Sequence, residues 1–177
     1  MSPAKPSSPE ANDLHWHAVY TRPRAEKQVW QRLNDQGIEA FLPLRKTLRQ
    51  WSDRKKLVEI PLFTSYVFVK IDRSDYDRVL QVPGVVKYIF FEGRAAVIRQ
   101  REIDNLRILV DSNADVETTW ERFEKGEQVV VTAGALKGLS GELISQGNRK
   151  RVLVRIDRID QNLVVEVPPG LLERARQ

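Results

Sequence analysis

Short runs of alternating apolar and polar residues predict strands in the first part of the chain. Successive side chains of a strand point to opposite faces, so such alternation marks one buried face. The predicted strands are residues 16–21, 38–42, 61–71, 85–91 and 95–98. Three helices are predicted between and after them, marked by Pro23 to Gly37, by Ser74 with Asp77 as a capping pair, and by Ile103, Leu106 and Val110. The pattern predicts an α+β domain over residues 14–110, with helices beside an antiparallel sheet.

One of these strands, PLFTSYVFVKI at residues 61–71, is apolar on both faces. Tyr66 and Phe68 share one face, while Val67 and Val69 share the other. A strand in a small domain usually turns one face to water. The segment therefore raises the question of what covers its aromatic face.

The second part of the chain has a different pattern. Residues 1–13 predict a disordered tail, and residues 111–122 lack an apolar period and predict a flexible linker. Residues 123–177 contain short β-branched runs separated by Gly, Asn, Asp and Pro, with no helical period until Leu171. The predicted strands are residues 128–132, 141–145, 151–155 and 163–167. They predict a small all-β barrel.

Composition narrows the class of protein. Hydrophobic residues make up 41% and charged residues 30% of 177 residues, which is typical of a globular chain. No apolar run approaches the roughly 20 residues that span a bilayer. The absence of cysteine excludes disulfides and thiol chemistry. We expect a cytoplasmic monomer without a membrane partner.

Positive charge is concentrated in the first domain. Residues 14–110 hold 18 basic and 11 acidic residues, whereas residues 111–122 hold four acids and one base. Such an excess indicates a polyanion partner, and a surface kept soluble by its cations is the alternative. The excess is greatest around a turn predicted at Ser52-Asp53, between two basic arms that predict a hairpin.

Few residues suggest catalysis. His15 and His17, with Asp13, have the spacing of metal ligands on one strand face, but a polar strand start is the simpler interpretation. A second acidic group, Asp72, Asp75 and Asp77, fits helix capping better than metal binding. No phosphate-binding glycine loop and no nucleophile motif is present, so we expect no enzyme and no cofactor.

Several segments resemble a known family. FEKGEQVVV with VTAGALKGLSGEL resembles the KOW motif of transcription factors and ribosomal proteins. WHAVYTRPRAEKQVWQRLNDQGIEAFLPL, PLFTSYVFVKI, VPGVVKYIFFEGRAAVI and REIDNL appear in the order and spacing of the NusG N-terminal domain. Together they resemble a NusG-family transcription elongation factor. TRPRAEKQV and RQWSDRKKLVEIPLF are similar to the specialised RfaH and UpxY-like antiterminators.

This resemblance implies a binding site for the clamp helices of RNA polymerase. Its lining would be an apolar groove with Tyr66 and Phe68 as floor and other aromatic residues nearby: Trp16, Tyr20 and Phe63. The alternative is that Tyr66 and Phe68 are core residues covered by the third helix. Many relatives have Pro-Gly or Pro-Asn where this chain has Thr64-Ser65.

The resemblance also places the hairpin beside upstream or non-template DNA. Its cations would contact phosphates and Trp51 would stack on a base. The predicted nucleic-acid residues are Arg22, Arg24, Lys27, Arg45, Lys46, Arg49, Trp51, Arg54, Lys55, Lys56 and Arg73. A solvated hairpin with Trp51 folded back on the sheet is the alternative.

For the second domain the resemblance implies a partner such as a small-subunit ribosomal protein or Rho. Leu136 and Ile156 fall on the expected contact positions, but Asp157 replaces an aromatic residue and an apparent insertion, DRID, follows. The β-branched runs predict a stable barrel with no helical form. The expected function is transcription elongation and antitermination; a KOW protein that binds the ribosome or its RNA is the alternative.

Overall fold

The structure, a computed structural model, describes residues 13–119, 121–122, 124–146 and 149–175. Residues 1–12 of the predicted tail lie outside the described residues. The first domain has the elements β1 (His15–Thr21), α1 (Glu26–Asp35), β2 (Glu39–Phe41), β3 (Leu44–Gln50), β4 (Lys55–Pro61), β5 (Tyr66–Ile71), α2 (Tyr76–Leu80), β6 (Val85–Tyr88), β7 (Phe90–Phe91), β8 (Arg94–Ala95), β9 (Val97–Ile98) and α3 (Gln100–Ser112). The second has β10 (Val116–Thr119), β11 (Glu127–Val131), β12 (Ser140–Gln146), β13 (Arg149–Ile156), η1 (Asp157–Ile159), β14 (Gln161–Glu166), η2 (Pro169–Leu171) and β15 (Leu172–Arg174). No helix in these ranges is long and apolar enough to cross a membrane.

The N-terminal domain is built on an antiparallel sheet with strand order β2-β5-β1-β6, and β9 continues the β6 edge of β1. One face of the sheet packs under α1 and α2. Val67 and Val69 of β5 join Val29 and Leu33 of α1 in this core. The predicted α+β architecture is confirmed. The two helices on this face, α1 and α2, lie in the segments where the sequence predicts the first two helices.

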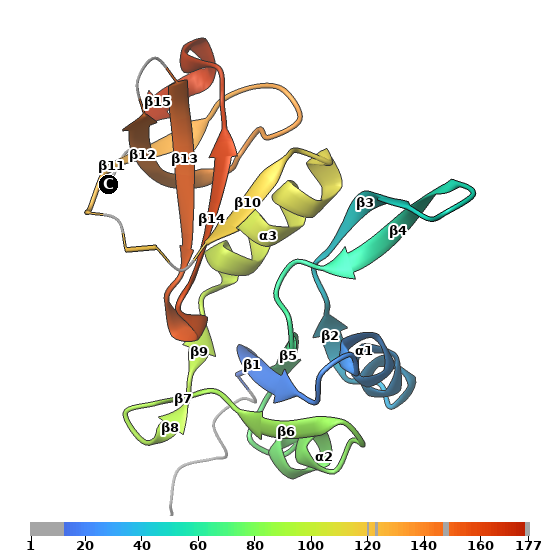
Figure 1. Cartoon of the computed structure of the whole chain (residues 1–177). Coiled ribbons are helices and arrows are strands. Elements are labelled where there is room, and N and C mark those ends of the chain that lie inside the picture. The colour runs from blue at the N-terminus through green and yellow to red at the C-terminus, as the bar shows by residue number, and fades with distance from the viewer. Residues whose placement is uncertain (1–12, 120, 123, 147–148, 176–177) are drawn as a thin grey trace, which may run out of the picture.

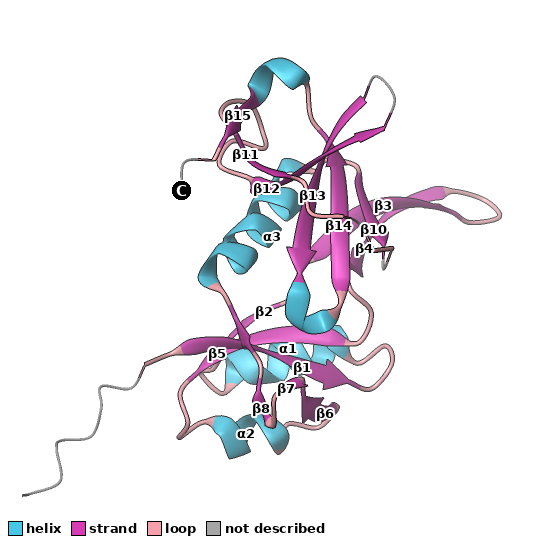
Figure 2. Ribbon diagram, turned by 90° about the vertical axis from the view of Figure 1, so that its left-hand side faces the viewer, coloured by secondary structure: helices cyan, strands magenta, loops and turns pink. Residues whose placement is uncertain are grey.

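The opposite face of the same sheet is also covered. Trp16 and Phe68 belong to a second core, which contains Ile103 and Leu106 of α3 and residues of the C-terminal domain. A strand buried on both sides is apolar on both sides, which accounts for the pattern of β5. The cover consists of α3 and, beyond it, the second domain (Figures 1 and 2).

The β3–β4 hairpin projects from the N-terminal domain as a separate two-stranded sheet (Figure 1). Its arms pair from Leu44 opposite Pro61 to Gln50 opposite Lys55, which confirms the predicted turn between basic arms. In α1, the Lys27 ammonium donates a hydrogen bond to the Glu59 carbonyl at 2.7 Å. This contact attaches the hairpin to the first helix.

Two predictions from local signals around α2 and β6 are wrong. Ser74 does not cap α2; its backbone N–H and hydroxyl both donate to Asp72 Oδ1, at 2.7 and 2.6 Å. A carboxylate accepts more hydrogen bonds than a hydroxyl, so Asp72 organises this turn. The strand predicted over residues 85–91 is divided into β6 and β7, and the β7–β8 turn has positive φ at Glu92 and Gly93.

The C-terminal domain is a six-stranded antiparallel sheet with strand order β10-β14-β13-β12-β11-β15. Its four long strands confirm the predicted all-β domain. The segment after Leu171, predicted to regain a helical period, forms the edge strand β15 instead. The predicted linker also needs correction, because α3 continues to Ser112 and β10 forms within the linker by pairing with β14.

The two domains share one core. Val131, Leu139 and Ile156 of the C-terminal domain lie in the same buried cluster as Leu106 of α3. Figures 1 and 2 both show α3 lying against the C-terminal sheet. The described structure is therefore a closed arrangement in which the second domain packs on the first.

Candidate functional site

Three of the five aromatic residues predicted to bind a partner are enclosed. Trp16, Phe63 and Phe68 are 2%, 2% and 0% exposed. The Phe68 ring centroid lies 6.3 Å from that of Phe63, and the Trp16 indole N–H donates to the Gln100 side chain of α3 at 3.0 Å. The aromatic floor is not open in this closed arrangement. Its use as a binding surface stays a prediction.

Tyr20 and Tyr66 lie at the edge of this floor and are half-buried. They are directly opposite each other on β1 and β5, and their rings meet edge to face with centroids 5.7 Å apart. Burial raises the pKa of Tyr66, and the neighbouring Tyr20 and the carboxylate of Asp160 raise it further. Because Asp160 belongs to the C-terminal domain, Tyr66 marks the boundary between the domains.

The C-terminal domain covers the floor with the end of β13 and with η1. Ile156 and Ile159 lie in the same cluster as Phe68. The guanidinium of Arg158 lies 3.7 Å from the centroid of the Phe91 ring in β7, within cation–π distance. The apparent DRID insertion forms this contact. Figure 1 shows the turn between β13 and β14 beside β9.

The residues predicted to contact a separate partner from the C-terminal domain face the shared core. Ile156 is 0% exposed, and Leu136 is half-buried against the same cluster. Their use as contacts for a separate partner stays a prediction.

The hairpin residues are exposed as predicted. Trp51 is 56% exposed, so it is not folded back on the sheet. Arg45 donates to the Val116 carbonyl of β10 at 3.4 Å. In the described residues no ion pair within the protein involves the six cations of the hairpin: Arg45, Lys46, Arg49, Arg54, Lys55 and Lys56. Arg22, Arg24 and Lys27 are also exposed, and Lys27 contacts the hairpin base.

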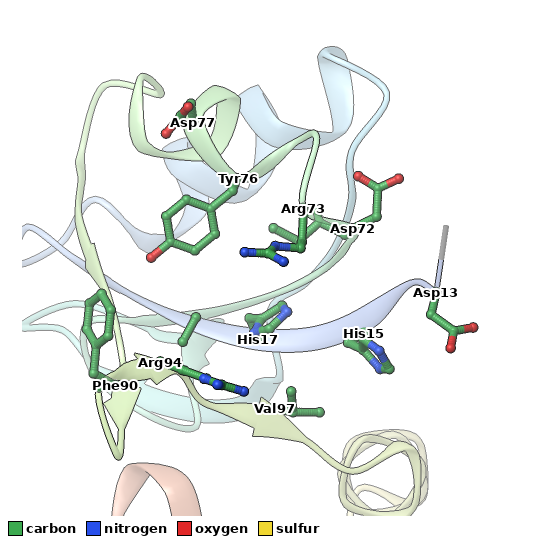
Figure 3. Close-up of a pocket in the computed structure, with 13 residues that line it drawn as sticks. Asp13, His15, His17, Asp72, Arg73, Tyr76, Asp77, Phe90, Arg94 and Val97 are labelled. Carbon is green, nitrogen blue, oxygen red and sulfur yellow. The ribbon is translucent and has the colours of Figure 1, made fainter. Parts of the chain in front are cut away.

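Arg73 lies elsewhere, beside a hollow of about 730 Å³ between the start of β1, the turn after β5 and the β7–β8 hairpin (Figure 3). His17 and Tyr76 also line it, together with Phe90 and Arg94. The structure therefore separates Arg73 from the hairpin with which it was grouped.

Two groups in the hollow have shifted pKa values. Burial lowers the pKa of His17, although a hydrogen bond with the Ala96 carbonyl at 3.0 Å acts in the opposite direction. Hydrogen bonds from Ser74 lower the pKa of Asp72. No group of three His, Cys, Asp or Glu residues within the described ranges is arranged to hold a metal ion.

Sequence reasoning missed the residues that join the domains. Asn105 in α3 forms hydrogen bonds with the backbone of Ser140 in β12. The Arg107 guanidinium lies 5.5 Å from the Trp16 ring centroid and covers it from the α3 side.

An exposed apolar pair on the hairpin was also missed. Leu48 and Leu57, paired across the hairpin, are 67% and 57% exposed. The alternation of β3 and β4 was the available signal for this apolar pair.

Comparison with known proteins identifies a family and several relatives of similar sequence. Residues 14–107 match the family described as "Transcription termination factor nusG". The chain is 26% identical to the "Transcription termination/antitermination protein NusG" of Rickettsia felis, with 85% of each chain covered. It is 25% identical to the protein so described from Haemophilus influenzae, with 81% of this chain and 80% of the relative covered.

A solved structure has the same overall arrangement of elements. "Domain interaction in Thermotoga maritima NusG" superposes with a TM-score of 0.51 at 21% identity, covering 92% of this chain and 98% of the other. That likeness concerns the fold alone. The family match spans more than half of the chain and includes β1, the hairpin and α3 up to residue 107. The chain therefore belongs to the NusG family of transcription termination and antitermination factors.

Proposed function

We propose that the chain binds elongating RNA polymerase and suppresses pausing or termination. The aromatic floor of the N-terminal sheet docks on the clamp helices, and the β3–β4 hairpin contacts upstream or non-template DNA. Family membership supports a role in transcription. The aromatic composition of the floor and the exposure of the hairpin cations support the assignment of the two surfaces.

The docking proposal depends on one observation, the composition of the core between the domains. Trp16, Phe63 and Phe68 belong to one buried cluster that also contains Ile156 and Ile159 of the other domain. If the second domain moved away, the part of the aromatic floor that α3 does not cover would be exposed, and exposed apolar patches mark interaction sites. A helix pair in a hydrophobic groove is a common mode of recognition, and aromatic anchors carry much of its free energy.

Docking at this floor requires the C-terminal domain to leave it. Polymerase that binds only the open arrangement shifts the population toward that arrangement. Opening also uncovers Leu136 and Ile156, which then become available to a second partner, either a small-subunit ribosomal protein or Rho. The connection through residues 113–115 keeps the released domain at high local concentration.

The hairpin provides the nucleic-acid contact. Its cations can neutralise phosphates because they make no ion pairs within the described protein, and the exposed indole of Trp51 can stack on an unpaired base. A factor bound to both sides of the polymerase cleft stabilises the processive state. A coupling free energy of about 1–3 kcal/mol changes pausing several-fold.

The proposal is tested by retention of core RNA polymerase on the immobilised full chain. Tyr20→Ala with Tyr66→Ala, both half-buried positions, should reduce retention at least tenfold, whereas Trp51→Ala should not. Trp51→Ala should instead weaken binding of a forked DNA duplex. Unchanged polymerase retention in the tyrosine double variant would reject the docking surface. RNA-dependent retention of ribosomes in place of polymerase would favour a translation-side function.

A further inference from the structure

The hollow lined by Arg73 and Arg94 lies apart from the aromatic floor and from the β3–β4 hairpin. Its volume of about 730 Å³ lies within the range of small-molecule sites. It is formed by three separate parts of the N-terminal domain: the start of β1, the turn after β5 and the β7–β8 hairpin (Figure 3). A ligand in this hollow would therefore be held by side chains from all three.

Two arginine side chains enter the hollow from opposite sides. Figure 3 shows the guanidinium of Arg73 on the side of α2 and that of Arg94 on the side of β8, with His17 between them. Within the described residues neither guanidinium has a carboxylate partner. Each guanidinium has five N–H donors in a planar fork, which matches the paired oxygens of a phosphate or a carboxylate.

Aromatic side chains form one end of the hollow. The Tyr76 ring is stacked on that of Tyr88 with centroids 4.1 Å apart, and the Tyr88 hydroxyl donates to the Tyr76 carbonyl at 3.0 Å. These contacts hold Tyr76 in place. The Phe90 ring, also at this end in Figure 3, is 55% exposed. A fixed ring and an uncovered ring offer stacking surfaces to a flat heterocycle.

His17 supplies a hydrogen-bond acceptor. Its Nδ1 lies 3.0 Å from the Ala96 carbonyl oxygen, and because a carbonyl only accepts, Nδ1 carries the proton. Burial lowers the pKa of His17, so the ring is neutral near pH 7 and Nε2 has a free lone pair. Such an acceptor suits an N–H or O–H donor of a ligand.

The carboxylates of the hollow limit the length of the ligand. In Figure 3, Asp13 and Asp72 lie at the end away from the rings, and Asp77 lies beyond Tyr76. Asp72 Oδ1 is already engaged by the backbone and hydroxyl of Ser74. A long polyphosphate that extended past the arginines would meet like charge. The proposed ligand therefore carries a short phosphate group.

We propose that this hollow binds a nucleoside mono- or diphosphate, with its phosphate between Arg73 and Arg94 and its base against Tyr76 and Phe90. The proposal goes beyond the proposed role in transcription and does not depend on it. A nucleotide here would contact only the N-terminal domain. It could therefore bind in both the closed and the open arrangement.

Isothermal titration calorimetry of the full chain tests the site, with AMP, GMP, ADP and GDP as probes. At least one of them should bind with one site per chain, at least tenfold tighter than adenosine, guanosine or inorganic pyrophosphate. Arg73→Gln with Arg94→Gln should weaken binding at least tenfold, and Phe90→Ala should weaken it several-fold. Lys87→Gln, an exposed cation on β6, is the matched control and should leave binding unchanged.

Three results would overturn the proposal. The first is the absence of saturable binding by all four nucleotides at millimolar concentration; the second is equal affinity in the arginine double variant. The third is binding of a twelve-nucleotide single strand, lost in the double variant, without binding of any mononucleotide. Arg73 and Arg94 are exposed, so the variants should fold, which circular dichroism can verify. Retention of RNA polymerase, measured separately, should be unchanged in the double variant.

Discussion

The side-chain amide of Asn105 pairs with both backbone groups of Ser140, in the manner of a neighbouring strand. The Asn105 Nδ2–H donates to the Ser140 carbonyl at 2.8 Å, and the Ser140 N–H donates to Asn105 Oδ1 at 3.1 Å. Asn105 is 5% exposed. A helix of the N-terminal domain thus satisfies the hydrogen bonds at the start of β12, a strand of the C-terminal domain. This relationship is specific to the closed arrangement.

Replacing Asn105 should open the domains. Asn105→Ala leaves the Ser140 N–H and carbonyl without a partner in the closed arrangement, at a cost of about 2 kcal/mol. Alanine favours helix, so α3 itself should persist. NMR relaxation of the labelled chain should report two domains that tumble separately. Arg101 is exposed on the same helix, and the Arg101→Ala variant is the control. Its two domains should tumble together as one body. Joint tumbling of the Asn105 variant would contradict this account.

The contact between Arg158 and Phe91 should stabilise the same arrangement. A cation–π pair of this kind contributes about 0.5–1 kcal/mol. A double-mutant cycle with Arg158→Ala and Phe91→Leu measures it through the equilibrium between closed and open chains. The two changes should be less than additive by that amount. Additive effects would show that the guanidinium and the ring do not interact in solution.

Stability of the C-terminal domain should depend on pH through Glu142. Burial alone would raise the pKa of Glu142, but the hydrogen bonds from Arg155 and from the Gly126 N–H outweigh it, so the pKa is lowered from 4.5. The bond lengths are 2.7 and 3.1 Å to Arg155 and 3.0 Å to Gly126. This contribution is present above the unfolded-state pKa and is lost as pH falls through the lower folded-state pKa.

Glu142→Gln should therefore lower the free energy of unfolding by about 2 kcal/mol at pH 7. Its stability should change less than that of the natural chain between roughly pH 5 and pH 3, because the titrating group is gone. Urea unfolding at several pH values provides the measurement. Glu173→Gln, exposed on β15, serves as control. Parallel pH profiles for the natural chain and the Glu142→Gln variant would contradict the assignment.

Replacing Ser65 in the turn before β5 with glycine should increase the stability of the fold. Ser65 has a φ of 65°, a left-handed conformation that costs a residue with a Cβ about 1–2 kcal/mol. Ser65→Gly removes this cost and retains the backbone hydrogen bonds to Glu26 and Thr21. The greater freedom of unfolded glycine offsets part of the gain, so thermal unfolding should show a net stabilisation of about 0.5 kcal/mol. Ser65→Val should destabilise, and equal stability of the glycine and valine variants would contradict the argument.

The sequence was informative where structure is local or periodic. The pattern of β5 raised the question of what covers its aromatic face, and the alternative to an open groove, cover by the third helix, holds for Phe68 in the closed arrangement. The basic arms around Ser52 predicted the hairpin. At Thr64-Ser65, where the resemblance led us to expect a different pair, Ser65 has positive φ. Local chemistry misled at α2, where Ser74 donates its hydroxyl and backbone N–H to Asp72 instead of capping the helix.

Contacts between distant segments were not predictable in this way. Asn105 is a polar residue in a helix, and nothing in its neighbours indicates that it meets residue 140. The four residues of β10 have one buried apolar side chain, Val116, too weak a signal for a strand whose formation depends on β14. The role of η1 likewise comes from its position beside Phe91, which the sequence does not encode locally.

The most direct test of the central claim is to hold the two domains together and measure polymerase binding. The chain has no cysteine, so Phe91→Cys with Arg158→Cys creates a unique pair that a short bismaleimide can link across the domain contact. The linked chain should lose binding to core RNA polymerase, while the same variant capped with N-ethylmaleimide should bind at least as well as the natural chain. Equal affinity of the linked and capped chains would contradict docking through the covered aromatic floor.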